Sequence, residues 1–176
     1  HRRAAHNQLG IGDWARITAS QVHVAKIRTV GAENLESLSS RQDPEVDGFI
    51  TQLADVALGI YVADCGAVFV VDPVRKALGL LHSGIKGTEL GITRVAIERM
   101  QAEFGSNPSD LIVSLAPCIR PPAYEIDFAT DILCQATESG VPESQVHDCG
   151  ICTASDLENY YSYRAEKGHT GRMLAL

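Results

Sequence analysis

The apolar block from Val56 to His82 constrains the fold more than any other part of the sequence. It contains three apolar runs, Val56–Val62, Val68–Val71 and Ala77–His82, which are separated by short breaks rich in Asp and Gly. Short continuous apolar runs between turn residues are typical of strands that are covered on both faces. The block therefore predicts the centre of a sheet that lies between two other layers.

The segments on either side of this block predict further strands and several helices. Residues 31–46 are polar and predict the longest loop, and Asp47-Gly48 predicts a turn. We expect strands in Ile17–Val30, Phe49–Thr51, Leu111–Leu115 and Arg172–Leu176, and helices in residues 1–10, in Glu89–Phe104 with Thr88 as N-cap, in Asp127–Ser139 and in Ser155–Tyr161. This pattern indicates an α/β or α+β fold, built as a single compact domain over residues 1–176 with a mixed sheet covered by helices.

The net charge of the chain argues against several classes of partner, and its apolar runs and cysteines indicate its location. The 176 residues carry a net charge of −7 and no Lys/Arg-rich run, which argues against nucleic acid or an anionic membrane as a partner. No apolar run approaches the roughly 18 residues of a membrane span, and the start of the chain lacks the apolar stretch of a signal peptide. The five cysteines are therefore expected to be reduced thiols of a cytoplasmic protein, where a functional cysteine is a ligand or a nucleophile.

Three residues of metal-ligand type stand where predicted strands end: His23, Cys65 and His82. Two imidazoles and one thiolate suit zinc and leave a fourth position for water or substrate. Asp64 is a candidate for orienting a ligand histidine through a hydrogen bond. The alternative also stands, because a histidine at a strand end is more often structural and a cysteine after an apolar strand more often belongs to the core.

The loop after His82 has the composition of an anion site. Gly84 and Gly87 permit close backbone approach, Lys86 adds a positive charge, and a predicted helix follows; a plain strand-to-helix connector is the alternative. We assign phosphate or substrate binding to this loop and to two arginines beside a tyrosine-rich stretch, whose default interpretation is a surface or core-edge position. These candidate binding residues are Ser83, Gly84, Lys86, Gly87, Thr88, Arg164 and Arg172.

A CxxC pair, Cys149 and Cys152, lies just after His147. It has no second CxxC to complete a zinc knuckle and does not follow a predicted strand, as a thioredoxin-type motif does. We interpret the spacing as coincidence rather than as a redox or metal site.

Short motifs along nearly the whole chain resemble those of the YfiH-like proteins. This family is also called the laccase-domain or multicopper polyphenol oxidase family, and its members are regarded as purine nucleoside phosphorylases with adenosine deaminase activity. The motifs occur in the order of the family: Gln21-Val22-His23, Val46-Asp47-Gly48, Ala63-Asp64-Cys65, Asp72-Pro73, His82-Ser83-Gly84, Lys86-Gly87, Gly91-Ile92, Pro117-Cys118-Ile119, Tyr124-Glu125, Cys152-Thr153, Tyr161-Ser162-Tyr163-Arg164 and Thr170-Gly171-Arg172-Met173.

The resemblance implies an α+β fold and a catalytic zinc triad of His23, Cys65 and His82. It implies a purine nucleoside and orthophosphate as substrates, with phosphorolysis and adenosine deamination as reactions. Cys118 and Cys152 lie in matched segments and are assigned a structural role. The chain departs from the family at Ile85-Lys86, where the family usually has Trp-Arg. We also expect it to lack the family's N-terminal strands.

Three other functions are alternatives to this one. A cysteine hydrolase would use Cys65 as nucleophile and His82 as its base, and a degenerate homologue would act only as a scaffold. A multicopper oxidase needs more histidine ligands than the six in this chain supply. Zinc is therefore the expected metal, and copper is less favoured.

Overall fold

The structure is a computed structural model that describes residues 8–40 and 45–176. Its strands form two sheets. The strands are β1 (Ala15–Thr18), β2 (Ile27–Val30), β3 (Gly48–Thr51), β4 (Val56–Val62), β5 (Gly66–Asp72), β6 (Ala77–Ser83), β7 (Ile112–Leu115), β8 (Val146–Asp148) and β9 (Met173–Ala175). The helices are α2 (Leu35–Ser40), α3 (Ile85–Glu89), α4 (Ile92–Phe104) and α5 (Phe128–Glu138), with 3₁₀ turns at Pro108–Asp110, Glu143–Gln145 and Thr153–Ser155.

The larger sheet has six strands in the order β2-β3-β6-β5-β7-β8. Its outer pairs, β2 with β3 and β7 with β8, are parallel, and its inner pairs are antiparallel. The smaller sheet has the order β1-β4-β9, with β1 parallel and β9 antiparallel to β4. The fold is therefore α+β with mixed sheets, as the sequence predicted.

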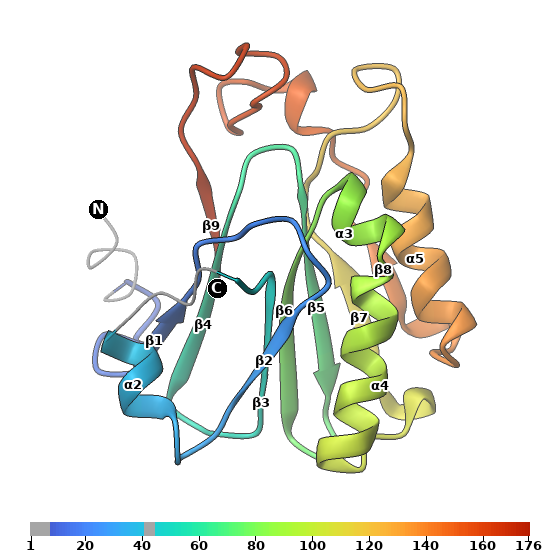
Figure 1. The fold of residues 1–176 in the computed structure, drawn as a ribbon. Helices are drawn as coiled ribbons and strands as arrows, with labels where there is room; N and C mark the ends of the chain where they lie inside the picture. The colour runs from blue at the N-terminus through green and yellow to red at the C-terminus, as the bar shows by residue number, and fades with distance from the viewer. Residues whose placement is uncertain (1–7, 41–44) are drawn as a thin grey trace.

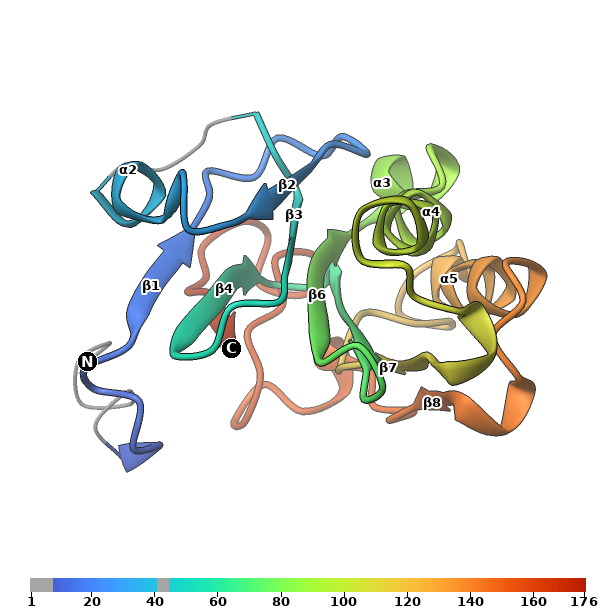
Figure 2. The same cartoon turned by 90° about the horizontal axis from the view of Figure 1, so that it is seen from below.

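The six-stranded sheet lies between two layers, as expected for its apolar strands. Helices α3, α4 and α5 cover one face, and the smaller sheet with α2 lies on the other (Figures 1 and 2). One core cluster joins the sheet to the helices through residues such as Val68, Ile97 and Ile132. A second joins it to β1 and β4 through Phe49, Ile60 and Leu80. Strands β5 and β6 contribute to both cores, because successive side chains on a strand point to opposite faces.

Several predicted segments differ in the structure. The polar residues 31–46 contain helix α2, because Leu35 and Leu38 pack against the second core cluster. The helix expected in Ser155–Tyr161 is absent; Asp156 instead closes a turn by accepting the backbone N–H of Asn159 and Tyr160. The helix expected over residues 1–10 falls largely outside the described residues.

The sequence predicted Thr88 as the N-cap of the long helix, but the structure contradicts this. Thr88 lies inside the short helix α3, and its backbone N–H donates to the carbonyl of Gly84. The long helix α4 begins later, after Gly91, whose φ of 73° is in the left-handed region that glycine adopts at low cost.

No helix within residues 8–40 and 45–176 has both the length and the apolar character needed to cross a membrane.

Candidate metal centre and active site

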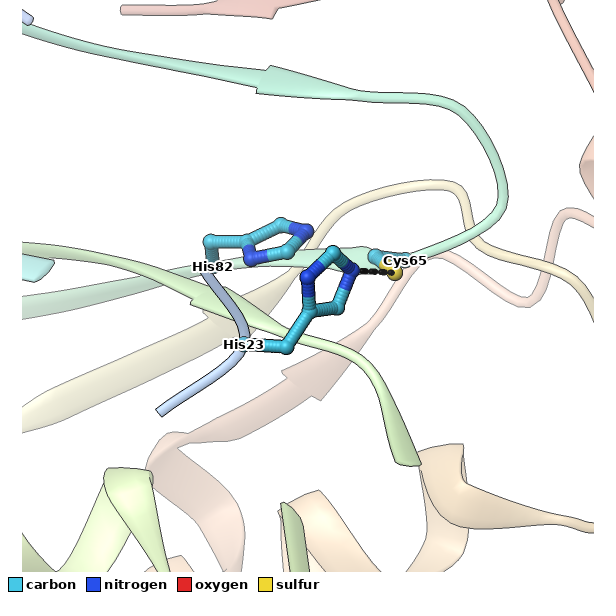
Figure 3. Close-up of side chains that lie close together, drawn as sticks. All are labelled: His23, Cys65 and His82. Carbon is cyan, nitrogen blue, oxygen red and sulfur yellow. Dashed lines mark hydrogen bonds between the residues drawn. The ribbon is translucent and has the colours of Figure 1, made fainter. Parts of the chain in front are cut away.

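The structure brings His23, Cys65 and His82 together at one end of the six-stranded sheet (Figure 3). His82 is near the end of β6, Cys65 directly precedes β5, and His23 lies in the loop between β1 and β2. One ligand atom from each residue lies within 4.8 Å of the others. The Sγ of Cys65 is 3.9 Å from Nε2 of His23, and the two imidazole rings pack edge to face at 4.8 Å. The three residues therefore form a group that can hold a metal ion.

Asp47 is the carboxylate that orients this group. It is fully buried, and its Oδ1 is 2.7 Å from Nδ1 of His82. Its two oxygens also accept the backbone N–H groups of Val22, His23 and Val24 at 3.1, 3.0 and 2.9 Å. These bonds hold His23 with a φ of 63°, a conformation that residues other than glycine seldom adopt. One side chain thus fixes the ring of one histidine and the backbone of the other.

The hydrogen bond from Asp47 also decides which nitrogen of His82 is available. A histidine that donates Nδ1–H to a carboxylate presents Nε2 to a metal, and such partners are usual for ligand histidines. Asp64, the residue that the sequence suggested for this role, does not have it. Its carboxylate accepts the hydroxyl of Thr153 and the backbone N–H of Arg164, both at 2.7 Å.

The surroundings of Asp47, Cys65 and His82 favour the charged form of each residue. Burial disfavours the charged form of each residue, but the hydrogen bonds oppose it. Bonds to Asp47 and Cys65 raise the pKa of His82 to about 9. Bonds and positive charge from His23 and His82 lower the pKa of the Cys65 thiol to about 7. Bonds from His82 and the backbone hold the pKa of Asp47 below its usual value.

The geometry and the donor set fit zinc. Tetrahedral zinc with bonds of about 2.0–2.3 Å places neighbouring ligand atoms about 3.4–3.6 Å apart. The 3.9 Å between Sγ of Cys65 and Nε2 of His23 is close to that spacing, and the 4.8 Å within which all three ligand atoms lie requires a closure of about 1 Å. Gly84 makes room for the sulfur, because a Cβ at this position would lie 2.6 Å from Sγ of Cys65.

A cavity of about 1330 Å³ opens over these three residues. Its walls include several aromatic and cationic side chains. Phe128 and Tyr124 pack edge to face with ring centroids 6.3 Å apart, and the guanidinium of Arg164 lies 4.9 Å from the centroid of Tyr124. The Arg172 guanidinium lies 5.5 Å from the ring centroid of Tyr163. The aromatic faces can pack against a planar ring, and the cations can hold an anion.

The predicted binding residues divide into two groups. Gly84, Lys86, Arg164 and Arg172 line the cavity. Ser83, Gly87 and Thr88 are buried and do not line it. The Ser83 and Thr88 hydroxyls are 2.9 Å apart, and Thr88 also donates to the carbonyl of Gly84. These three residues shape the turn beneath the cavity rather than its surface.

The remaining cysteines lie away from the three ligands. Cys118 and Cys152 are paired by a short parallel β-bridge, and burial raises the pKa of the Cys118 thiol to about 12. All five cysteines are free thiols. The CxxC segment is held by Arg120, which forms an ion pair with Asp148 at 2.5 Å and donates to the carbonyl of Ile151. Among the described residues, His23, Cys65 and His82 form the one cluster with metal-ligand geometry.

Sequence reasoning missed Asp47, Tyr124 and Phe128 as site residues. Asp47 was interpreted as half of a turn, although a carboxylate directly before a buried strand is itself a signal. The two aromatic residues follow the Pro-rich turn after β7, and only the tertiary structure brings them to the ligands.

Comparisons with known proteins agree with this site and fold. A family model described as "Multi-copper polyphenol oxidoreductase laccase" matches residues 1–134 and 126–176. The protein named purine nucleoside phosphorylase YlmD from Bacillus subtilis is 30% identical, over 73% of this chain and 57% of its own length. Its namesake from Geobacillus stearothermophilus is 29% identical, over 97% of this chain and 76% of its own length.

The fold is also that of a solved relative. The crystal structure of YlmD from Geobacillus stearothermophilus matches 99% of this chain and 77% of that chain, with a TM-score of 0.91 and 27% identity. The chain spans little more than half of the Bacillus subtilis relative, at 57% of its length. Because the family model matches the whole chain, this chain belongs to the multi-copper polyphenol oxidoreductase laccase family, the YfiH-like proteins.

Proposed function

We propose that this protein is a zinc-dependent purine nucleoside phosphorylase that cleaves adenosine- or inosine-type nucleosides with orthophosphate and also deaminates adenosine. The observation that carries the proposal is the cluster of His23, Cys65 and His82 at the base of an aromatic and cationic cavity. The names of the relatives support the same activity, since they are called purine nucleoside phosphorylases.

The donor set favours zinc over a multicopper centre. The described residues contain one three-residue ligand cluster, whereas a multicopper oxidase needs several copper sites. Two imidazoles and a thiolate leave one zinc coordination position open. Zinc held by these residues would supply Lewis acidity and lower the pKa of water, which deamination at C6 of adenine requires.

Phosphorolysis places separate demands on the rest of the cavity. A phosphate oxygen forms a bond to C1′ as the bond from C1′ to the purine nitrogen breaks, and the purine takes that electron pair and a proton. Lys86, Arg164 and Arg172 are assigned to phosphate, because all three are cationic and line the cavity. Tyr124 and Phe128 are assigned to the flat face of the nucleoside.

The test is to incubate zinc-loaded protein with adenosine or inosine, with and without orthophosphate. We expect free purine and ribose-1-phosphate only when phosphate is present, and inosine from adenosine with or without it. A metal-loaded protein that gives none of these products would refute the proposal. Failure to bind any metal would favour a non-enzymatic scaffold instead.

A cysteine hydrolase is the second candidate, and the electrostatics of the site favour it specifically. The thiol of Cys65 has its pKa lowered to about 7, and His82 has its pKa raised to about 9. With Asp47 on the far side of His82, the three residues form a Cys-His-Asp series. Stoichiometric alkylation of Cys65 by iodoacetamide, at a rate that zinc does not change, would favour this candidate over the metal enzyme.

A further inference from the structure

Asp64 connects the metal centre to a distant part of the chain. It directly precedes Cys65, is 8% exposed, and has a φ of 84°. Its Oδ1 accepts the hydroxyl of Thr153 at 2.7 Å, and its Oδ2 accepts the backbone N–H of Arg164 at 2.7 Å. Its own backbone carbonyl accepts the N–H of Ile119, which lines the cavity. Both groups that donate to the Asp64 carboxylate come from residues 153–172, which we call the C-terminal arm.

The C-terminal arm carries much of the cationic wall. It supplies Tyr163, Arg164 and Arg172 to the cavity. The side chain of Arg164 is 55% exposed and forms an ion pair with the exposed Glu125, in which Nη2 donates to both carboxylate oxygens at 2.9 Å. Exposed ion pairs contribute little stability, because water and salt screen them. The bonds to Asp64, one buried and one partly buried, are therefore the stronger constraint on where this part of the arm lies.

We infer that Asp64 is a positioning residue for the anionic substrate. It holds the arm, and with it Arg164, at a fixed distance from the neighbouring metal ligand Cys65. The anion held by the arm and the group bound at the metal centre then stay at a fixed distance and orientation relative to each other. This inference rests on the proposed function in one respect, because it takes orthophosphate as the anion.

The chemistry of the two donors makes a graded set of variants possible. Asp64→Ala removes both acceptor oxygens. Asp64→Asn keeps one oxygen for the N–H of Arg164, and its amide can donate to the hydroxyl of Thr153, because a hydroxyl both donates and accepts. Thr153→Val removes the hydroxyl, whereas Thr153→Ser retains it. The hydrogen bonds between Asp64 and the arm are thus retained in Asp64→Asn and Thr153→Ser. At least one of them is lost in Asp64→Ala and Thr153→Val.

A matched control lies far from the cavity. Thr51 is 2% exposed, donates its hydroxyl to the carbonyl of Val30 at 2.8 Å and accepts the N–H of Leu53 at 3.0 Å. Thr51→Val therefore removes a buried hydroxyl of comparable bonding without touching the arm. It reports what a general loss of stability does to the kinetics.

The experiment measures the KM for orthophosphate, kcat, bound zinc and hydrogen exchange of the Arg164 amide in each variant. A charge-assisted hydrogen bond corresponds to about a tenfold or larger effect. We expect Asp64→Ala to raise the phosphate KM about tenfold or more, to change kcat far less, and to retain zinc. Thr153→Val should show a smaller rise, and Asp64→Asn, Thr153→Ser and Thr51→Val should remain near the parent protein.

Two results would overturn the inference. One is loss of zinc from Asp64→Ala while the remaining zinc-loaded protein keeps an unchanged KM for phosphate. That result would mean that Asp64 positions only the ligand Cys65 and not the arm. The other is an equal rise in KM for Thr51→Val. If the parent protein has no phosphorolytic activity, the proposed function fails separately. Calorimetric titration of the zinc-loaded protein with orthophosphate then decides the inference: weaker binding in Asp64→Ala but not in Asp64→Asn supports it, and equal binding refutes it.

Discussion

Replacing Asp47 by asparagine tests whether one carboxylate organises both histidines of the metal centre. Every donor that faces Asp47 is an N–H group: three from the backbone of Val22, His23 and Val24, and one from the ring of His82. An asparagine offers one oxygen in place of two and adds an N–H₂ group that these donors cannot bond. At Asp64, the Thr153 hydroxyl can accept a hydrogen bond instead of donating one, but among the described residues no hydroxyl faces the carboxylate of Asp47.

The two orientations of the asparagine fail in different ways. If its nitrogen replaces Oδ2, the N–H groups of Val22 and Val24 lose their acceptor. If its nitrogen replaces Oδ1, the N–H of His23 loses its acceptor. Nδ1 of His82 then faces an N–H₂ group and can only accept a hydrogen bond from it. The ring proton must then move to Nε2, the nitrogen that a metal would bind.

The magnitude follows from the number of donors left unpaired. Each costs about 1–3 kcal/mol, and partial exposure of this loop places the total at about 2–4 kcal/mol. At about 2–4 °C per kcal/mol for a chain of this size, the metal-free protein should melt about 4–16 °C lower. Loss of the partner of a ligand histidine should weaken zinc binding about 10–100-fold.

The assay combines scanning calorimetry of the metal-free protein with zinc affinity measured by competition with a chelator. Asp64→Asn is the matched control for stability, because the same change there leaves its donors with partners and should lower the melting temperature far less. The reasoning is refuted if the two variants melt at the same temperature and Asp47→Asn binds zinc within about threefold of the parent protein.

Other features of the site give predictions that separate its parts. Gly84→Ala should weaken zinc binding about tenfold or more in chelator competition, because its Cβ would lie 2.6 Å from Sγ of Cys65, whereas Gly87→Ala, whose Cβ would meet nothing closer than 3.4 Å, should not. Zinc binding should release about two protons from Cys65 and His82 below pH 7 and about one between pH 7 and 9, since their pKa values are about 7 and about 9. The apparent affinity for zinc should therefore rise with pH. Calorimetry in buffers of different ionisation enthalpy measures the number of protons released, and a number independent of pH would contradict the prediction. Zinc at a hundredfold excess over its dissociation constant should stabilise the fold by about 2.7 kcal/mol, so a chelator should lower the melting temperature by about 5–11 °C, and an unchanged melting temperature would argue against a metal at this site.

The sequence predicted the elements that are defined by local patterns. The central strands β4, β5 and β6 and the helices α4 and α5 follow from apolar runs and helical spacing, and their positions place Cys65 and His82 at strand ends. The helix expected to begin at Asp127 begins one residue later, at Phe128, and the side chain of Asp127 caps it by accepting the N–H of Thr130.

Elements that depend on distant contacts were not predictable in this way. Strand β8 consists of Val146, His147 and Asp148, and it forms only because β7 offers a parallel edge. The role of Asp47 requires contact with residues more than twenty positions earlier, and that of Asp64 with residues about a hundred positions later. No local pattern encodes such pairings, since an Asp-Gly dipeptide equally describes an ordinary turn.

The unequal burial of the three ligands bears on how quickly a bound ion could be exchanged. His82 is 4% exposed, Cys65 is half-buried, and His23 is exposed on a loop. Because His23 lies on an exposed loop, it is the ligand that an incoming chelator or protein partner would reach first, so we expect release of an ion to begin there. We therefore expect opening of the His23 loop to affect the rate of metal exchange more than the equilibrium affinity, to which the two inner ligands also contribute. Variants of the loop around His23 can therefore change the residence time of the ion without a matching change in how tightly it is held.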